Sequence, residues 1–360
     1  MSRSLPFGGF TPSRTTLALL EDIERRIDPE TEDDLKEQWK AFLYGSFSGD
    51  IFTPQRKKLT PPTVPFPSVH INDTLTDYDL MLIQQLIGVS AALNSPATIP
   101  CLRANYGSAI MATLFGAELY VMPRDTGTLP TTRTLHDPDA MDNILARGLP
   151  DLYGGQGRQV LEFGEICAEL FSHYPKISKY VTVYHPDLQG TLDVCELLFG
   201  ENLFYAMYDD PDTVHGVFSL VTDTYTAFMQ KWHEIYPPEA DINVHWGGFY
   251  HRGSLVLRSD SAMNLSPELY REFSRPYDKI LLDRFGGGVM HFCGRGDHYI
   301  ADLCSIDTLY GVNMSQPELN DMETIYRNTV DKGIKLLSFN RHRAEQDKNR
   351  PGGFSGNMHC

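Results

Sequence analysis

The chain has 360 residues, of which 41% are hydrophobic and 22% charged, a composition that excludes wholesale disorder and suits one or two globular domains. Its 31 Lys and Arg residues stand against 47 Asp and Glu residues, so the net charge is −16 and binding to nucleic acid or an anionic membrane surface is disfavoured. Apolar runs fall far short of the roughly 18 residues of a membrane span or the length of a secretion signal. With six widely spaced cysteines, these features predict a cytoplasmic protein with reduced thiols.

The first part of the chain, residues 1–74, is predicted to be a helical extension followed by a proline-rich connector. Within residues 31–43, acidic residues come first, where they suit the helix dipole. Apolar residues then recur at helical spacing, at Leu35, Trp39, Phe42 and Leu43. Residues 59–69 contain four prolines in eleven residues, which excludes a helix and favours an extended connector.

A different rhythm begins at residue 75, where short apolar runs alternate with amphipathic stretches. The clearest helix covers residues 211–234, and another opens at Ser266 and is expected to kink at Pro276. The predicted strands are Thr98–Leu102, Glu118–Met122, Val181–Tyr184, Ile242–Trp246, Val289–Cys293, Leu309–Met314 and Ile334–Phe339. Strands that alternate with helices favour an α/β architecture with a parallel sheet. We therefore predict a (β/α)8 TIM barrel over residues 75–360, behind the N-terminal helical extension.

The sharpest local feature is VMHFCG at residues 289–294, an apolar strand that runs into His-x-Cys and a glycine. Side chains alternate along a strand, so His291 and Cys293 are expected to project together at its C-terminal end, where the chemistry of a barrel lies. Imidazole and thiolate are good zinc ligands, and three protein ligands with one open position define a catalytic zinc site. Two ligands alone do not make a site, and the other interpretation is a hydrogen-bonded histidine beside an ordinary buried thiol.

Longer phrases in the same region resemble the uroporphyrinogen decarboxylase superfamily, and above all its zinc-dependent, corrinoid-linked methyltransferase branch. The phrases are HPDLQGTLDVCELLFG at 185–200, YDDPDTVHGVFSLVTD at 208–223, NLSPELYREFSRPYDKILLDRFGGGVMHFCG at 264–294, GVNMSQPE at 311–318 and, less specifically, RANYGSAIMATLFGAE at 103–118. The resemblance covers most of residues 75–340. It implies a (β/α)8 barrel and a zinc ion, bound by His291 and Cys293, that holds the methyl donor or acceptor.

The sequence departs from the family's pattern after the last predicted strand. Family members with this zinc take a further cysteine from that point, whereas IKLLSFNRHRAEQ at residues 334–346 contains none. The later Cys360 follows a flexible, glycine-rich tail that is long enough to fold back over a barrel mouth. We predict Cys360 as the further metal ligand, with an unused terminal thiol as the alternative. Other residues that could supply the third ligand are Asp260, His245, His251 and His298.

Several polar residues fall at predicted strand ends, which meet at one end of a barrel. We predict that they line a polar substrate pocket, although for each residue alone a structural hydrogen bond is the other interpretation. These residues are Arg103, Asn105, Tyr106, His185, Asp187, His245, Asp260 and Asn313.

Three functions compete. The first is zinc-dependent transfer of a methyl group between a small molecule and a corrinoid protein, with zinc and the partner's corrinoid as cofactors. The second is metal-free decarboxylation of a porphyrinogen, which the net charge of −16 and the absence of the family's arginine-rich N-terminal loop disfavour. The third is a non-catalytic barrel that binds a corrinoid protein or a small ligand, which the missing cysteine favours. We prefer the first function, with no nucleic-acid or membrane partner.

Overall fold

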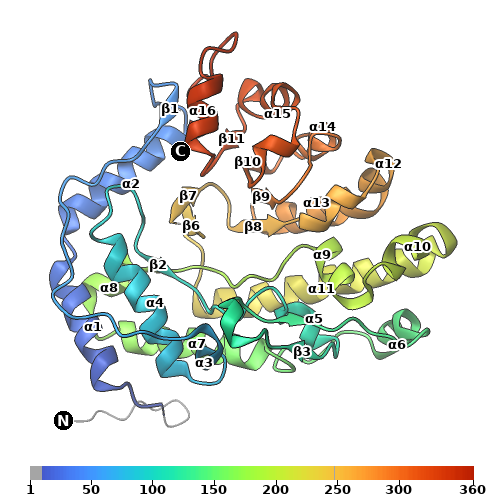
Figure 1. Ribbon diagram of the computed structural model, residues 1–360, viewed down its shortest axis with the longest axis horizontal. Coiled ribbons are helices and arrows are strands. Elements are labelled where there is room, and N and C mark those ends of the chain that lie inside the picture. Colours follow the sequence, from blue (N-terminus) through green and yellow to red (C-terminus); the bar gives the residue numbers. More distant parts are fainter. Residues whose placement is uncertain (1–9, 247) are drawn as a thin grey trace.

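The computed structural model describes residues 10–246 and 248–360, where helices alternate with short strands around a parallel sheet (Figure 1). The helices are α1 (Arg14–Arg26), α2 (Pro29–Leu43), α3 (Ile71–Thr74), α4 (Tyr78–Ala92), α5 (Ile110–Leu114), α6 (Ala140–Arg147), α7 (Gly157–Phe171), α8 (Pro175–Tyr180), α9 (Thr191–Phe199), α10 (Asn202–Asp209), α11 (Pro211–Ile235), α12 (Pro267–Leu269), α13 (Arg275–Arg284), α14 (Ile300–Leu303), α15 (Met322–Asn328) and α16 (Arg341–Asp347). Among the described helices, none combines the length and the apolar character needed to cross a membrane.

The strands are short, and most of them pair in parallel. They are β1 (Ile51–Phe52), β2 (Cys101–Leu102), β3 (Leu119–Tyr120), β4 (Thr131–Thr132), β5 (Thr182–Val183), β6 (Asn243–His245), β7 (Phe249–His251), β8 (Leu255–Arg258), β9 (Gly288–Phe292), β10 (Leu309–Met314), β11 (Lys335–Leu336) and β12 (Met358–His359). One six-stranded sheet has the order β1-β12-β11-β10-β9-β8 with all neighbours parallel. A second parallel pair joins β2 to β5. The predicted α/β class with a parallel sheet is therefore confirmed.

The parallel strands of the described residues do not close into one continuous ladder. A hydrogen bond from Val256 N–H to His185 Nε2 (3.0 Å) links β8 to the end of β5. Another, from Arg56 N–H to the Pro96 carbonyl (2.6 Å), links the chain after β1 to the chain before β2. Side-chain and single backbone contacts thus bridge the gaps where a closed ladder would have strand pairing.

Two of the predicted strands belong to antiparallel hairpins rather than to the parallel sheet. The run at residues 118–122 gives β3, which pairs with β4, and the run at 242–246 gives β6, which pairs with β7. An apolar run indicates a buried strand but carries no information on the direction of its partner. Three parallel strands, β1, β8 and β12, were not predicted.

Helix α2 packs against the inner face of the sheet. Val256 of β8 and Val289 of β9 lie in one buried cluster with Trp39 of α2. Met290, the next residue of β9, faces the opposite cluster, which contains the outer helices. His291 follows Val289 by two positions and therefore shares the inner side. The N-terminal extension and the sheet thus fill one interior, and the predicted domain boundary after residue 74 stays a prediction.

The helix predicted to kink at Pro276 does change its geometry there. Helix α12 passes through a π-helical turn, Tyr270–Ser274, before α13 begins at Arg275. Proline has no backbone N–H and its ring crowds the preceding turn, so the ordinary i to i−4 hydrogen bonding is interrupted. The turn lies near the cluster described below, because α9, which supports that cluster, contacts it.

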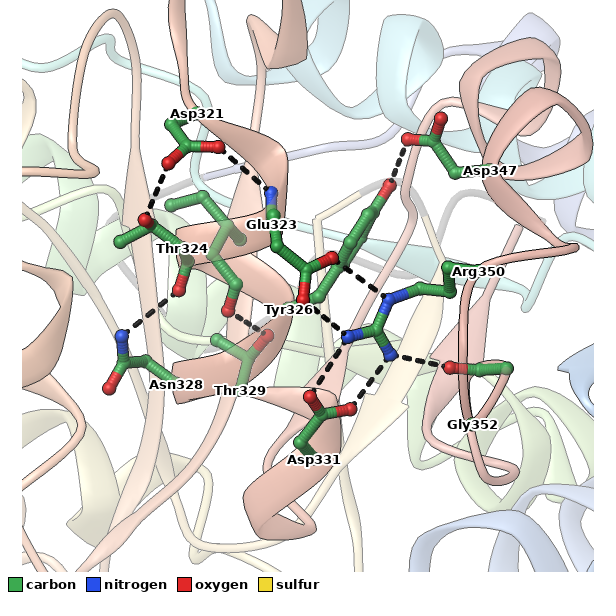
Figure 2. A network of polar contacts seen from close by, with 12 residues as sticks. Asp321, Glu323, Thr324, Tyr326, Asn328, Thr329, Asp331, Asp347, Arg350 and Gly352 are labelled. Atoms are coloured by element: carbon green, nitrogen blue, oxygen red, sulfur yellow. Dashed lines mark hydrogen bonds and ion pairs between the residues drawn. The ribbon is translucent and has the colours of Figure 1, made fainter.

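The C-terminal tail, residues 348–360, is held by ion pairs and by a strand. Figure 2 shows Arg350 between Glu323 and Asp331, with nitrogen–oxygen distances of 3.2 and 2.8 Å. The tail ends in β12, which lies between β11 and β1. The prediction of a flexible tail is therefore wrong. The ion pairs of Arg350 hold the start of the tail, and the strand hydrogen bonds of β12 hold its end.

Candidate metal centre

Strand β9 brings together the two side chains of the His-x-Cys motif. Cys293 Sγ lies 3.4 Å from His291 Nε2, as expected for residues i and i+2 at the end of a strand. His291 is buried, at 2% exposed, whereas Cys293 is partly exposed. The chain then turns at Gly294 with a φ of +74°, a conformation that favours glycine, so the strand ends and Cys293 stands at its rim.

Strand β10 fixes the tautomer of His291. Asn313 lies opposite His291 in the β9–β10 register, and its Nδ2 donates to the Leu337 carbonyl (2.7 Å). This leaves Asn313 Oδ1 to accept from His291 Nδ1 at 2.6 Å. The proton therefore lies on Nδ1, and the lone pair of Nε2 faces Cys293. A metal-binding histidine needs this arrangement.

A third ligand-type side chain, Asp260, comes from the turn after β8. Its Oδ1 lies 3.6 Å from His291 Nε2 and accepts a hydrogen bond from Cys293 N–H (2.7 Å). The turn is held by buried Asp193 of α9, which accepts from Asp260 N–H and Ser261 N–H at 2.9 and 2.7 Å. The ligand atoms of Asp260, His291 and Cys293 all lie within 4.8 Å of one another. We call these three residues the Asp-His-Cys cluster.

Burial sets the protonation of this cluster. It lowers the pKa of His291, with the Asp260 carboxylate opposing the shift, so the ring is neutral at pH 7 and Nε2 keeps its lone pair. Burial raises the pKa of the Cys293 thiol. Burial also raises the pKa of Asp193 to about 7, and the neighbouring Asp260 carboxylate adds to this shift. The cluster therefore holds a neutral imidazole and a thiol beside the Asp260 carboxylate, and a bound cation would displace the proton of the thiol.

An open cavity adjoins the Asp-His-Cys cluster. Its volume is about 370 Å³, and its lining consists of Trp246, Phe249, Asn313, Met314, Ser315, Ser338 and Asn340. Two of these residues form polar contacts with the cluster: Asn313 bonds to His291, and Ser315 Oγ lies 3.4 Å from Cys293 Sγ. A small molecule in this cavity would therefore lie next to the ligand atoms.

Three further predicted pocket residues form a charged network at the same end of the sheet. Asp187 Oδ2 lies 3.2 Å from Arg103 Nη1, and Asp187 Oδ1 pairs with Nε of Arg258. Arg103 Nε donates to Asn105 Oδ1 (2.9 Å). Arg258 in turn lies beneath the ring of Trp246, with 4.5 Å from Cζ to the ring centroid. The same ring meets the His291 ring edge to face at 4.9 Å, so the network adjoins the cluster.

The remaining predicted site residues lie apart from the Asp-His-Cys cluster. His185 Nδ1 bonds to the Pro186 carbonyl and its Nε2 accepts from Val256 N–H, so both ring nitrogens have partners. The His245 ring stacks obliquely on His185 with 4.3 Å between centroids. Tyr106 is fully buried in the hydrophobic core.

Two more histidines that the sequence offers as a third ligand bond to the backbone instead. His251 Nδ1 bonds to the Arg252 carbonyl at 3.0 Å. His298 Nε2 bonds to the Leu265 carbonyl, also at 3.0 Å. Neither belongs to the group of ligand atoms around His291 in the part of the chain that the structure describes.

Cys360 is part of the strand pairing at the other edge of the sheet. Its N–H donates to the Phe52 carbonyl (3.2 Å), and its carbonyl accepts from Thr53 Oγ1 (3.4 Å). Burial raises the pKa of its thiol to about 11. In the described residues, the metal-type cluster consists of Asp260, His291 and Cys293. The structure therefore does not bring Cys360 to His291 and offers a carboxylate in its place.

Sequence reasoning did not single out Arg258, Trp246 or Ser315. A signal for Arg258 was present, because it precedes Asp260 by two residues at the end of an apolar run, and alternation places both on one side. Ser315 follows Asn313 in the same way. Trp246 offers no comparable signal, since its position over Arg258 depends on how the β6–β7 hairpin lies against the sheet.

Comparison with known proteins supports the fold. No protein-family model and no curated protein matches the chain. Among solved structures, the chain is similar to a methyltransferase from Methanosarcina mazei, with a TM-score of 0.61. The alignment covers 85% of this chain and 82% of that chain at 14% sequence identity. At this identity the similarity shows a methyltransferase-like α/β fold, and the chemistry has to be argued from the site.

Proposed function

We propose that the protein is a cytoplasmic, zinc-dependent methyltransferase that moves a methyl group between a small molecule and a corrinoid protein. The observation that carries the proposal is the Asp-His-Cys cluster beside an open cavity. Two further findings support it: a solved methyltransferase has a similar fold, and residues 181–317 resemble the corrinoid-linked branch of the uroporphyrinogen decarboxylase superfamily. In this proposal the parallel strands form the wall of a (β/α)8 barrel whose rim carries the site.

The distances within the cluster suit a zinc ion. Two atoms bound to one tetrahedral zinc at about 2.0 to 2.3 Å stand roughly 3.3 to 3.8 Å apart. Cys293 Sγ lies 3.4 Å from His291 Nε2, and Asp260 Oδ1 lies 3.6 Å from the same nitrogen. Nitrogen, sulfur and oxygen donors from three residues would leave one position open for a substrate, which is the arrangement of a catalytic zinc.

The surrounding residues orient the side chains of the cluster for metal binding. When bound, zinc would supply Lewis acidity that favours the thiolate of a thiol substrate or polarises a methyl-bearing heteroatom. Asn313 holds His291 in the metal-binding tautomer, and Asp193 holds the turn that carries Asp260. Trp246 borders the cavity and shields His291 from water. A corrinoid presented by a partner protein would approach from the open side of the cavity.

Metal analysis of the purified protein tests the proposal. We expect stoichiometric zinc, which is lost in His291→Ala and Cys293→Ser and retained in the matched control Cys101→Ser, a partly buried cysteine of β2. Methyl transfer between methylcobalamin and a panel of thiols should disappear together with the metal. Full methyl transfer by the metal-free protein would contradict the proposal, and release of carbon dioxide from a porphyrinogen would favour the decarboxylase alternative.

A further inference from the structure

Two buried arginines lie next to the Asp-His-Cys cluster, in a protein whose net charge is −16. The side chains of Arg103 and Arg258 are 11% and 6% exposed, and both pair with the single carboxylate of Asp187. Asp260 makes no ion pair with either arginine in the part of the chain that the structure describes. Two guanidinium groups therefore share one carboxylate in direct ion pairs, and the Asp260 carboxylate nearby contacts His291 instead.

One atom of this network stands out. Arg258 Nη2 is buried and has no hydrogen-bond partner among the described residues. Asp187 Oδ1 accepts from Gln189 Nε2 (2.6 Å) and pairs with Arg258 Nε, its Oδ2 faces Arg103, and neither oxygen forms a hydrogen bond with Nη2. Buried charged donors without a partner are costly and rare, which indicates that a group absent from the chain itself completes the site.

The position of Arg258 indicates that this missing hydrogen-bond partner would be a ligand bound in the cavity. Arg258 lies opposite His291 in the β8–β9 register, one strand spacing away, or about 4.8 Å. The ring of Trp246 covers the guanidinium at 4.5 Å and also lines the cavity. Trp246 is 37% exposed, so its side chain has room to turn away from the guanidinium. A ligand in the cavity would then reach Arg258 and the Asp-His-Cys cluster together.

We propose that Arg258, backed by Arg103, binds a carboxylate of the small-molecule substrate. A guanidinium presents parallel N–H donors that match a planar carboxylate, and the second arginine adds positive charge beside the bound anion. Because Arg258 and His291 are on adjacent strands, the carboxylate and the substrate atom that binds the metal are only a few bonds apart. The substrate is thus a small carboxylic acid. Its assignment as the methyl donor or acceptor rests on the proposed function, whereas the binding of a carboxylate does not.

Binding of benzoate and of its neutral isostere benzamide to the metal-free protein tests this proposal. Calorimetry should show that wild-type protein binds benzoate and not benzamide. In Arg258→Gln, benzoate binding should weaken roughly ten- to a hundredfold, the loss expected for a charge-assisted hydrogen bond. The matched control is Arg284→Gln, which removes an exposed arginine at the end of α13 and should change nothing.

A second variant separates a binding role from a structural one. Asp187→Asn removes the internal acid that competes for both arginines, so benzoate should bind more tightly than to wild type. A purely structural network would give the opposite result or no change. Equal binding of benzoate and benzamide, or unchanged benzoate affinity in Arg258→Gln, would overturn the proposal. Since no metal or turnover is involved, loss of the zinc hypothesis would leave these outcomes unaffected, and the reverse also holds.

Discussion

Two parallel strands of the same sheet run into a cysteine, and their ends differ in almost every contact. After β9, Cys293 lies 3.4 Å from His291 with Asp260 close by. After β12, Cys360 follows directly on His359, whose ring packs against Trp39 at 4.4 Å and whose Nδ1 accepts from a backbone N–H. At the end of β9, the lone pair of His291 Nε2 is directed at Cys293 Sγ, beside the open cavity. At the second end the imidazole and the backbone are occupied by packing and strand pairing.

The difference follows from one residue of spacing. In His-x-Cys, the imidazole and the thiol are two positions apart and emerge on the same side of the strand. In the adjacent pair His359-Cys360 they emerge on opposite sides, so they cannot bind one ion without breaking the strand. Both strand ends carry a histidine and a cysteine. Backbone alternation brings the two side chains together after β9, at the candidate metal site, and separates them at β12, where the strand end contributes to the sheet.

The largest expected effect is on zinc affinity, measured by competition with a chelator. Cys293→Ser should weaken zinc binding by more than about a hundredfold, because outer hydrogen-bond partners alone are worth roughly 10- to 100-fold. Cys360→Ser should leave the affinity unchanged, since this thiol lies outside the cluster. A point substitution is required, because deletion of residues 358–360 would remove β12 as well. Equal losses in the two variants would remove the distinction between the two strand ends.

A smaller effect on the same affinity is expected from the residue that orients the imidazole. Asn313→Ala removes the acceptor for His291 Nδ1–H and should weaken zinc binding roughly 10- to 100-fold. Asn313→Asp keeps an acceptor there and should retain most of the affinity, although it gives up the hydrogen bond to the Leu337 carbonyl. If the two variants lose affinity equally, Asn313 acts through packing rather than through the tautomer.

At the other strand end the expected effect is on stability. Arg350→Met should lower the free energy of unfolding by about 2 kcal/mol, because its side chain is 7% exposed and forms charged hydrogen bonds that anchor the tail. Urea denaturation would measure this loss, while zinc affinity stays at the wild-type value. The comparison variant Arg271→Met removes a similar pair of ion contacts at 47% exposure and should have a clearly smaller effect.

The smallest effect expected is a pH dependence of the tail. Burial lowers the pKa of His359 from 6.5 to about 3, so the folded state takes up a proton less readily than the unfolded state. Its stabilising contribution is complete above pH 6.5 and is lost as the pH falls from there toward 3. Hydrogen exchange of β12 should therefore accelerate between pH 6.5 and 5, and less so in His359→Asn, which keeps an acceptor for Ser338 N–H. Identical pH profiles would show that this ring does not control the tail.

The sequence predicted the features that depend on local periodicity. Alternation along an apolar run placed His291 beside Cys293, and the same run predicted β9 in a parallel sheet. Asp260 was recognised at a strand end and as an alternative third ligand, but its position beside His291 depends on the turn held by Asp193, which is 67 residues away in the chain. Contacts of this kind leave no trace in a local pattern.

Other features could not be predicted either, because they too depend on contacts between residues far apart in the chain. The placement of Trp246 over Arg258 depends on the packing of a hairpin against the sheet, and one strand of each antiparallel pair was predicted as a strand of the barrel. β12 was not predicted because its pairing is non-local: its partner β1 lies near the other end of the chain. A tail rich in glycine was therefore predicted to be flexible, although ion pairs hold it in place.

The pairing of β1 with β12 also has a consequence for biosynthesis. Thr53 and Cys360, which form a hydrogen bond at this seam, are 307 positions apart. In a nascent chain the backbone of Ile51 and Phe52 therefore lacks its partner strand until Met358 and His359 have been translated. Contacts over such separations form late and slowly, so the unpaired edge is open to chaperones, or to a second nascent chain, while the residues between β1 and β12 are being synthesised.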